Sequence, residues 1–543
     1  MNAQAQAAED DVIVVGGGIA GIVGALELAQ NGRRIVLLER GVERDLGGQA
    51  RESFGGILVV DTPLQRRNGI RDSVALALAD WLRYGELAPG DGWPYRWAQA
   101  YVRECRGEVF DWLRALGVRF LPMPLWPERR GNSVARWHIV WGTGLVLTLT
   151  LIDCLRAHAR QVEVRYGHRV ERLLVEDGRV RGVAGAIEGS DETFALRGRA
   201  VLVAAGGIAG DLDLVRHFWP HQRGAAPREL LNGSGAFSDG RLHDACMAAG
   251  AHVANMQWMW NYAAGVRHWR PRHAHHGLSL VPPRSALWLD AQGRRFEPPL
   301  LAGFDTSELV ARIAEAGGDS WQILNRRIAL RELAVSGAEF NPALRDRRPL
   351  AFLRDLLLGN RWLLDTMCQH CPDFVQARTL GGLVQRMNAL CCEPAAQSSP
   401  PVRLESVEQA LRAFDAARLA PGDGGDAQWA NIRQARATKS DRWRTARPGP
   451  ILDPASGPLI AIRERILSRK SLGGITTDLD GRVLNAAGQP LQGLYAAGEA
   501  SGFGGGGMNG RRALEGTFLG GCIYSARRAA RGIMRDTAHD AAS

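Results

Sequence analysis

The chain contains 543 residues, of which 45% are hydrophobic and 23% are charged, and its formal net charge is +10. This length and composition exclude a disordered chain and allow two or three folded domains with buried cores. All but two of the 67 basic residues are arginines, scattered along the chain, which argues against the basic stripe of a nucleic-acid-binding protein.

The stretch from Asp11 to Glu39 has the pattern of a nucleotide-binding βαβ unit. Its first apolar run is short, β-branched and followed by glycines, which predicts a buried parallel strand. Gly16 would permit the tight turn, Gly18 would let a pyrophosphate approach, and Gly21 would let the helix pack on the strand. The helix N-terminus would then face the phosphates, and the Glu39 carboxylate would accept hydrogen bonds from ribose hydroxyls. This motif alone does not distinguish NAD from FAD.

The C-terminal segment favours FAD. The run Gly493–Glu499 predicts a strand whose last carboxylate can bond the ribityl chain of a flavin. Gly502 and Gly504–Gly507 would let the backbone approach the ring. A helix predicted to begin near Ala513 can direct its positive end at the flavin N1 and C2 carbonyl, which favours the anionic reduced flavin.

Between these ends, the chain alternates helical and strand-like segments. Strand-like runs within 162–187 turn at Asp177-Gly178, which predicts an antiparallel meander. The buried run Ala200–Gly207 then continues the nucleotide-binding sheet. A sheet with an inserted meander is therefore expected in the first 231 residues.

The composition changes near Asn232, mainly helical segments follow to about Arg436, and the sheet returns near Leu459. We therefore predict an α/β fold: a Rossmann-like FAD-binding domain with an inserted β-meander, plus an inserted α+β cap domain that binds substrate. The predicted boundaries place the two parts of the FAD-binding domain at 1–231 and 441–543, and the cap at 232–440.

Several features bear on the cellular setting. Eight cysteines are too few for a disulfide framework in a chain of this length. Cys368-Gln-His-Cys371 and Cys391-Cys392 could be drawn as a four-thiolate metal site, but the second pair lacks the usual spacer, so buried cysteines and no metal are expected. Met1–Asp10 is polar and lacks the apolar core of a signal peptide. No apolar stretch approaches the roughly 20 residues that a membrane helix needs. We expect a soluble, cytoplasmic protein without a membrane or nucleic-acid partner.

The motifs at both ends together resemble the flavoprotein superfamily of fumarate reductases, succinate dehydrogenases and 3-ketosteroid dehydrogenases. The segments that carry this resemblance are Val12–Glu39, Gly47–Gly56, Ala204–Gly207 and Gly493–Gly521. The chain more closely resembles a bacterial group labelled "FAD-binding dehydrogenase", near the ketosteroid branch. That likeness is carried by Gly47–Ala50, Trp137–Gly144, Gly504–Gly507 and Arg512–Gly521. The resemblance implies FAD, a cap over the flavin, and hydride transfer to or from carbon beside a carbonyl.

Succinate dehydrogenases attach FAD covalently through a histidine near the second glycine pair. Residues 47–56 contain no histidine, so this chain is expected to hold FAD non-covalently.

The positions at which fumarate reductases clamp and protonate a small dicarboxylate are occupied here by Lys470, Pro299 and Ala513. Dicarboxylate recognition by paired cations is therefore not expected. An apolar ring or acyl ketone is the expected substrate, with an unknown external electron acceptor. The aromatic residues expected to suit it at the cap edge are Trp258, Trp260, Tyr262 and Trp269.

The predicted cofactor-binding residues are Gly16, Gly18, Ala20, Gly21, Glu39, Gly48, Gln49, Ser53, Gly56, Val170, Ala205, Gly206, Glu499, Leu514 and Gly516. Three catalytic residues are predicted. His138 precedes Gly142-Thr143-Gly144, in a segment that the superfamily places near substrate, although a structural histidine is equally consistent with the sequence. Tyr262 could serve as a ketosteroid-type tyrosine or as a packing residue. Arg511 could stabilise an enolate or lie exposed. Arg267 and Lys470 are further acid–base candidates.

Three functions remain open from the sequence. The first is a dehydrogenase or reductase that acts on a C–C bond next to a ketone, with hydride transfer at flavin N5. The second is an oxidase or hydroxylase in which reduced flavin reacts with oxygen. The third is a flavin-binding partner subunit without turnover. A fumarate-reductase-like activity is disfavoured by the clamp positions.

Overall fold

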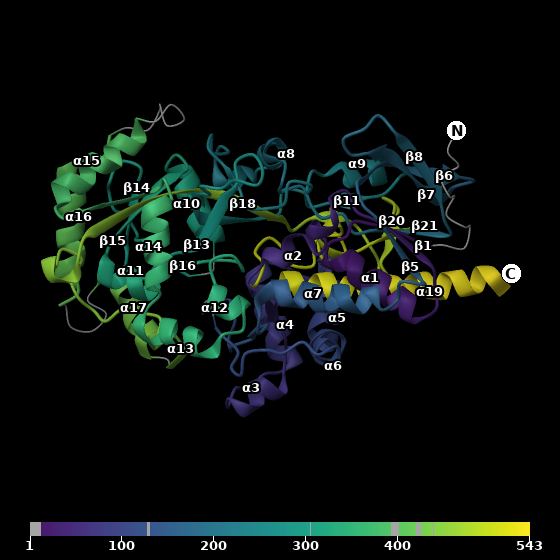
Figure 1. Cartoon of the computed structure of the whole chain (residues 1–543), viewed down its shortest axis with the longest axis horizontal. Helices are drawn as coiled ribbons and strands as arrows, with labels where there is room; N and C mark the ends of the chain where they lie inside the picture. Colours follow the sequence, from purple (N-terminus) through teal and green to yellow (C-terminus); the bar gives the residue numbers. More distant parts are fainter. Residues whose placement is uncertain are drawn as a thin grey trace.

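A computed structural model describes residues 12–126, 131–303, 306–392, 401–419, 425–437 and 439–542. Met1–Asp10, the stretch expected to lack a signal peptide, lies outside the described residues. The two ends of the chain fold together into one half of the molecule, and the middle of the chain forms the other half (Figure 1). Among the described residues, no helix is both long and apolar enough to cross a membrane.

The half formed by the two chain ends contains a six-stranded, mainly parallel sheet in the order β20-β21-β9-β1-β2-β5. Val12 pairs with Ile35 on one side and with Ala200 on the other, so the first strand is central. All four residues of each central strand are buried, as expected for a parallel strand covered on both faces. The strand bounds are β1 Val12–Val15, β2 Ile35–Leu38, β5 Val162–Arg165, β9 Ala200–Val203, β20 Arg482–Leu484 and β21 Pro490–Ala496.

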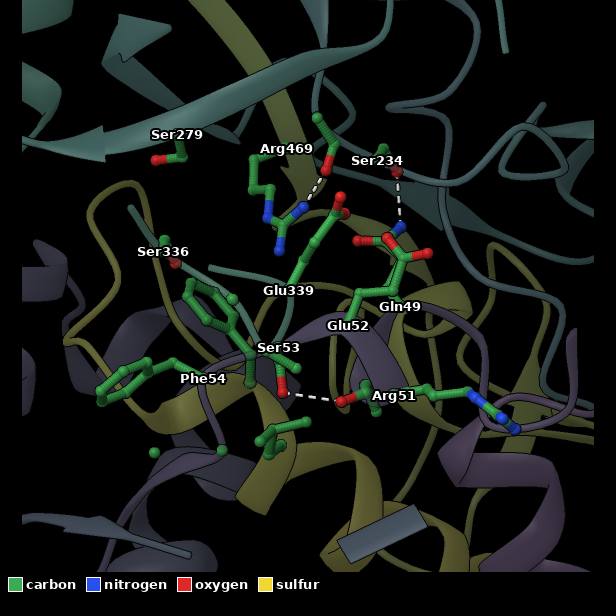
Figure 2. Close-up of a pocket in the computed structure, with 18 of the residues that line it drawn as sticks. Gln49, Arg51, Glu52, Ser53, Phe54, Ser234, Ser279, Ser336, Glu339 and Arg469 are labelled. Atoms are coloured by element: carbon green, nitrogen blue, oxygen red, sulfur yellow. Dashed lines mark hydrogen bonds between the residues drawn. The ribbon is translucent and has the colours of Figure 1, made fainter. Parts of the chain in front are cut away.

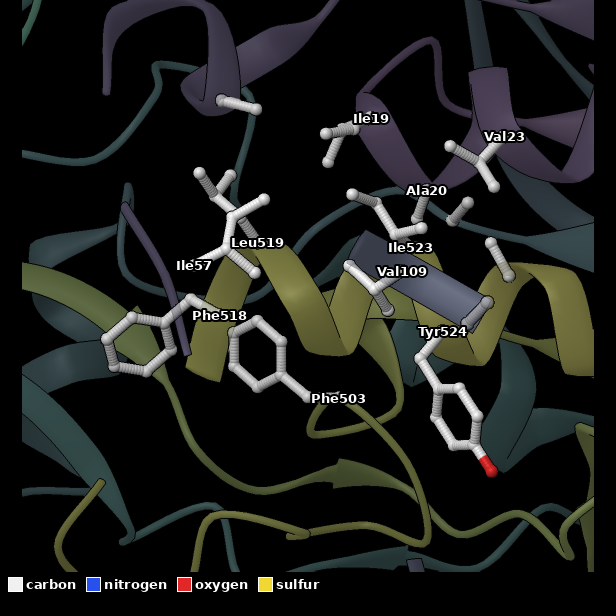
Figure 3. Packing of buried hydrophobic residues seen from close by; sticks show 14 of the residues in the cluster. Ile19, Ala20, Val23, Ile57, Val109, Phe503, Phe518, Leu519, Ile523 and Tyr524 are labelled. Carbon is white, nitrogen blue, oxygen red and sulfur yellow. The ribbon is translucent and has the colours of Figure 1, made fainter. Parts of the chain in front are cut away.

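Two helices from opposite ends of the chain pack together beside this sheet. Helix α1 spans Ile19–Gln30, and helix α19 spans Thr517–Ala542. Figure 3 shows Val23 of α1 facing Ile523 of α19 within one apolar cluster. The C-terminal helix begins four residues later than predicted, because Leu514 and the glycine at 516 form a turn before it. Burial of this shared face ties the two parts of the FAD-binding half together.

The predicted meander is present as a three-stranded antiparallel sheet of β6 (His168–Glu176), β7 (Arg179–Ile187) and β8 (Thr193–Arg197). The β6–β7 hairpin turns at Asp177 and Gly178, both with positive φ. The other α-helices and strands of this half are α2 Gly48–Glu52, β3 Gly56–Leu58, α3 Pro63–Arg67, α4 Val74–Gly85, α5 Trp93–Cys105, α6 Trp112–Ala115, β4 Trp137–Ile139, α7 Thr143–Arg156 and α9 Arg241–Ala248. Helix α8 (Leu212–His217) packs instead in an apolar cluster with residues of the other half of the molecule.

The other half is an α+β cap built on a mostly antiparallel sheet in the order β14-β15-β18-β12-β13-β16, with β10 and β17 also paired to β18. Its strands are β10 Leu231–Asn232, β12 Met259–Arg267, β13 Gly277–Val281, β14 Leu287–Asp290, β15 Asp319–Asn325, β16 Ala334–Val335, β17 Phe374–Ala377 and β18 Leu459–Ser471. A small pair, β11 (Val253–Ala254) and β19 (Gly474–Ile475), lies outside this sheet.

Strand β18 differs from the expectation. The sequence placed the sheet that returns near Leu459 in the FAD-binding domain, whereas the structure pairs β18 with four cap strands. The reason is its length of 13 residues, which lets different parts of one strand pair with several neighbours. The chain therefore re-enters the FAD-binding half only after Ser471.

Helices surround the cap sheet (Figure 1). Their bounds are α10 Ser307–Glu315, α11 Arg326–Glu332, α12 Pro342–Arg345, α13 Pro349–Leu358, α14 Arg361–His370, α15 Leu380–Cys391, α16 Leu404–Ala417, α17 Ala427–Ala437 and α18 Lys439–Arg442. A second apolar cluster fills the space between these helices and the sheet. Each half of the molecule thus has a core of its own, as expected of separate domains.

A buried ion network holds α4 against the segment before β4. The Arg136 guanidinium donates to the Asp72 carboxylate at 2.8 and 2.9 Å and to Asp80 at 2.6 Å. All three side chains are at most 3% exposed. Burial acts to raise the pKa of Asp80, but hydrogen bonds from Ser133 and Arg136 outweigh it and leave that pKa below its usual value.

We expect Arg136→Met to destabilise the protein by about 3–5 kcal/mol, because it leaves two buried carboxylates without their cation. Urea denaturation at neutral pH measures this, and Arg412→Met on the exposed face of α16 is the control. The network favours ionised Asp80, so its contribution is present above the ordinary aspartate pKa and is lost as the pH falls through the lowered pKa. Equal midpoints for the two variants at neutral pH would contradict this.

Candidate functional site

A cavity of about 1810 Å³ lies between the nucleotide-binding sheet and the cap. Its wall runs from the glycine turn after β1, past α2, to the cap segment that contains α11–α13. Cavities for one small ligand usually enclose about 300–1,000 Å³. This cavity therefore has room for a large cofactor and a second molecule beside it.

The glycine turn forms one end of the cavity. Gly16 has φ +103°, and a Cβ on it would lie 2.6 Å from the Ala204 carbonyl oxygen. A Cβ on Gly21 would lie 1.9 Å from the Gly16 carbonyl oxygen, whereas a Cβ on Gly18 would meet nothing within 4 Å. The first and third glycines thus permit close backbone packing, and the second borders open space. The backbone N–H groups at the start of α1 have no partner within the helix and suit a pyrophosphate.

Glu39 lies at the end of β2, beside this turn. Its carboxylate accepts hydrogen bonds from the backbone N–H groups of Gly17 at 2.7 Å and Gly41 at 2.6 Å. Burial raises the pKa of Glu39, and the two N–H donors oppose that rise. The side chain lines the cavity, in the place where a ribose would follow the pyrophosphate.

The middle of the cavity lies between α2 and the loop that follows β10. The Gln49 side-chain amide donates to the hydroxyl oxygens of Ser234 and Ser238. Its Oε1 is buried and has no hydrogen-bond partner among the described residues. Figure 2 shows Gln49, Ser234 and Arg469 directed into the same space, with Arg469 bonded to the carbonyl of Gly233. An unsatisfied buried amide oxygen facing a cavity is consistent with a polar ligand there.

Three ionisable side chains meet where β18 reaches the FAD-binding half. Lys470, Glu499 and Glu515 all line the cavity. The Ser471 backbone N–H donates to Glu499 Oε1 at 2.9 Å, which fixes the end of β18. Lys470 Nζ lies 4.2 Å from the centroid of the Phe518 ring.

Burial shapes the charges of this group. It lowers the pKa of Lys470 below its usual value of 10.5, and the neighbouring Arg469 charge lowers it further. Burial also raises the pKa values of Glu499 and Glu515, although the lysine charge opposes both shifts. Because the pKa of the lysine falls and the pKa values of the two carboxyl groups rise, the three groups become more similar in proton affinity. Groups of similar proton affinity exchange a proton readily, so this cluster suits proton transfer.

Tyr262 faces the cavity from the cap strand β12. Its ring packs edge-to-face on Trp260 at 6.2 Å. Beyond it the cap segments contribute many apolar side chains to the wall, with ionisable side chains such as Arg331, Glu339 and Arg345 among them. The apolar side chains of that part of the wall include Leu280, Leu330, Leu333, Phe340, Leu344, Phe352 and Leu356.

The structure does not bring His138 or Arg511 to the cavity wall. The His138 imidazole is 1% exposed and is held between the Thr62 hydroxyl and the Arg136 carbonyl, each at 2.7 Å. Burial lowers the pKa of His138 to about 4, so the ring is neutral near pH 7. On strand β4 its neighbours Trp137 and Ile139 line the cavity, and alternation turns His138 to the opposite face. Arg511 is exposed, with its guanidinium 5.9 Å from the Trp258 ring.

The structure also differs from the prediction that four aromatic residues of the cap edge face the substrate. Of its four members only Tyr262 lines the cavity. Trp260 is 2% exposed and packs on Phe518, and Trp269 packs on Phe340. The apolar side chains of the wall come instead from leucines and phenylalanines of the cap. The spacing of apolar residues in the sequence predicts that they are buried, but it does not show that they face a cavity.

Most of the other predicted site residues meet at the cavity. Those that line it are Gly16, Gly18, Ala20, Glu39, Gly48, Gln49, Ser53, Gly56, Val170, Ala205, Gly206, Glu499 and Gly516. Gly21 and Leu514 do not, since both are packed into the protein. Among the described residues, no group of three or more histidine, cysteine, aspartate or glutamate side chains is arranged to hold a metal ion.

These residues fit an FAD molecule. The glycine cradle and the start of α1 suit its pyrophosphate, Glu39 suits the adenosine ribose, and Gln49 offers an unsatisfied acceptor. Gly48, Gly56 and Gly516 leave backbone rather than side chains along the next part of the wall, as a planar ring requires.

Comparison with known proteins gives the same picture. The FAD binding domain family matches residues 11–519. A KsdD-like steroid dehydrogenase of Mycobacterium tuberculosis is 44% identical over 550 residues, covering 97% of this chain and 96% of the relative. One from Mycolicibacterium smegmatis is 43% identical, covering 98% and 100%. A solved 3-ketosteroid Δ1-dehydrogenase from Sterolibacterium denitrificans shares the fold with a TM-score of 0.70 at 17% identity, covering 97% of this chain and 100% of that one.

We expect Glu39→Ala to weaken FAD binding by roughly 1–3 kcal/mol, the scale of hydrogen bonds to a charged group. Fluorescence titration of the apoprotein with FAD measures the change. Glu43→Ala is the matched control, because that glutamate is nearby and its side chain is 66% exposed. Dissociation constants equal to wild type for Glu39→Ala would show that this carboxylate does not hold the ribose.

Proposed function

The chain belongs to the FAD binding domain family and is an FAD-dependent dehydrogenase related to ketosteroid dehydrogenases, and on this premise we propose that it acts on the C–C bond beside a ring ketone of a steroid-like substrate. The observation that supports the proposal is that a single cavity extends from the glycine turn after β1 to the apolar side chains of the cap. A fused-ring ketone is the substrate class that needs both an apolar wall and a few polar groups.

FAD, when bound, exchanges a hydride with carbon. The protein must then bind the ring, exclude water and handle the proton on the neighbouring carbon. The apolar segments of the cap provide the first two. For the third we propose two side chains that line the cavity, the Tyr262 phenol and the Lys470 amine.

We assign different tasks to these two groups. Tyr262, packed on Trp260, presents a hydroxyl that donates a hydrogen bond to the substrate carbonyl and so favours the enolate form. Lys470 exchanges the proton, because its lowered pKa allows a neutral amine and an ammonium to interconvert near working pH. Glu499 and Glu515 stabilise the charged form of this lysine.

The two lysines of the chain support this assignment. Arginine fills nearly every other basic position, yet one lysine lies in the cavity wall. Arginine stays charged at any working pH, whereas a buried lysine can release its proton. A titratable cation at position 470 is therefore consistent with a proton-transfer role and not with charge alone.

We expect the holoenzyme to oxidise a 3-ketosteroid with an artificial electron acceptor and to reduce fumarate poorly. Of the three clamp positions, Pro299 and Ala513 lie outside the cavity wall and carry no polar group. Each missing group aimed at developing charge costs on the order of 3 kcal/mol, so fumarate reduction should be slower by about four powers of ten than in a fumarate reductase. Dye-coupled assays with a panel of ring ketones and fumarate test this. Fast fumarate reduction without steroid turnover would overturn the proposed substrate class.

We expect Lys470→Arg to lower turnover by about 100-fold or more, the scale of losing a general acid or base. The charge is kept, so FAD content should stay as in wild type. In wild type the turnover number should depend on pH through the lysine, and the arginine variant should lose that dependence, because arginine does not release its proton. Lys439→Arg, at the other lysine of the sequence, is the control. An unchanged pH profile in Lys470→Arg would remove this role from Lys470.

A further inference from the structure

The outer surface of α13 is unusually apolar. Leu350 and Leu358 are 82% and 75% exposed, and Leu353 and Leu357 are also exposed. The spacing of 350, 353 and 357 places three of these leucines on one helical face. Trp443, which is 51% exposed, lies beside the end of the helix. These five residues are called the apolar rim below.

The apolar rim is continuous with the cavity. Leu353, Leu357 and Trp443 are exposed and also line the cavity wall. The Arg331 guanidinium donates to the backbone carbonyls of Leu357 at 2.8 Å and Trp443 at 3.3 Å, which holds the two parts of the rim together. A molecule resting on the rim therefore lies at the mouth of the substrate cavity.

The surroundings of the rim are basic. Residues 345–361 contain five arginines and two aspartates. Both aspartates are engaged by the arginines next to them, Asp346 by Arg345 and Asp355 by Arg354. Arg347 and Arg361 are exposed, and neither has an ion-pair partner in the part of the chain that the structure describes. The segment thus presents exposed leucines flanked by positive charge.

We propose that the apolar rim docks on an anionic lipid surface, from which an apolar substrate passes into the cavity without crossing water. A helix with exposed leucines and flanking arginines is the pattern of a segment that lies in the plane of a membrane interface. The leucines enter the acyl boundary and the arginines meet lipid phosphates. Two copies of this basic surface would repel each other, which disfavours a symmetric dimer through it.

Docking on a membrane surface differs from the expectation of no membrane partner. That expectation rested on the length that a spanning helix needs, whereas a docked helix needs only an exposed apolar face. The passage of substrate from the lipid into the cavity rests on the proposed function, whereas the docking of the rim on the lipid does not.

The test is sedimentation of the holoenzyme with lipid vesicles. We expect binding to phosphatidylcholine–phosphatidylglycerol vesicles, weaker binding at high salt, and little binding to phosphatidylcholine alone. The double variant Leu350→Ser/Leu358→Ser should bind at least about tenfold more weakly, because both exposed apolar anchors are lost. Leu419→Ser is the matched control, since that leucine is 71% exposed just after the end of α16, outside the rim. FAD content and thermal midpoint check that each variant is folded.

Each outcome bears on the proposal separately from the enzyme's activity. Wild type that stays in the supernatant with anionic vesicles, or equal binding by all three proteins, would overturn the docking proposal. A loss of self-association in the double variant, measured by light scattering without lipid, would instead identify the rim as an interface between copies and would also overturn it. Vesicle binding without steroid turnover would leave the docking intact and overturn the substrate class alone.

Discussion

Strand β18 is the element on which the arrangement of the site depends. It pairs with β10, β12, β15 and β17 of the cap, and its last residue is bonded to the FAD-binding half. The Ser471 N–H donates to Glu499, and the Ser471 hydroxyl accepts from the Ile208 N–H. The strand therefore fixes the cap relative to the nucleotide-binding sheet. It also carries Arg469 and Lys470 to the wall of the cavity between them.

This arrangement places the ionisable side chains of Lys470, Glu499 and Glu515 in the wall of a cavity, largely shielded from bulk water. A lysine beside two glutamates would be an ordinary surface group in water, worth little to stability. In the cavity wall, burial shifts the pKa of Lys470 downward and those of Glu499 and Glu515 upward. Burying three ionisable groups costs free energy of folding, which is consistent with a functional role. Side chains in a cavity whose pKa values are perturbed are commonly those that transfer protons. The apolar side chains that the cap contributes beyond Tyr262 complete the site.

The sequence predicted correctly those features whose backbone geometry is determined by neighbouring residues in the chain. Gly16, Gly18 and Glu39 could be predicted because a tight turn and a strand end leave few alternatives, and the β6–β7 hairpin because Asp177-Gly178 marks its turn. His138 could not be assigned, since a strand of three residues shows too little alternation to reveal which face meets the cavity. The role of β18 depends on pairing between distant segments, which local pattern does not contain. The signal for Lys470 was present as one of two lysines among many arginines, but only burial gives it meaning.

We propose that one cavity holds FAD and an apolar ring ketone side by side. A crystal structure of the holoenzyme soaked with a 3-ketosteroid tests it most directly. We expect the pyrophosphate at Gly18, the flavin ring along Gly48 and Gly516, and the steroid between that ring and the cap, with its ketone within hydrogen-bond distance of Tyr262. A steroid bound outside this cavity, or a flavin ring positioned away from Lys470 and Tyr262, would contradict it.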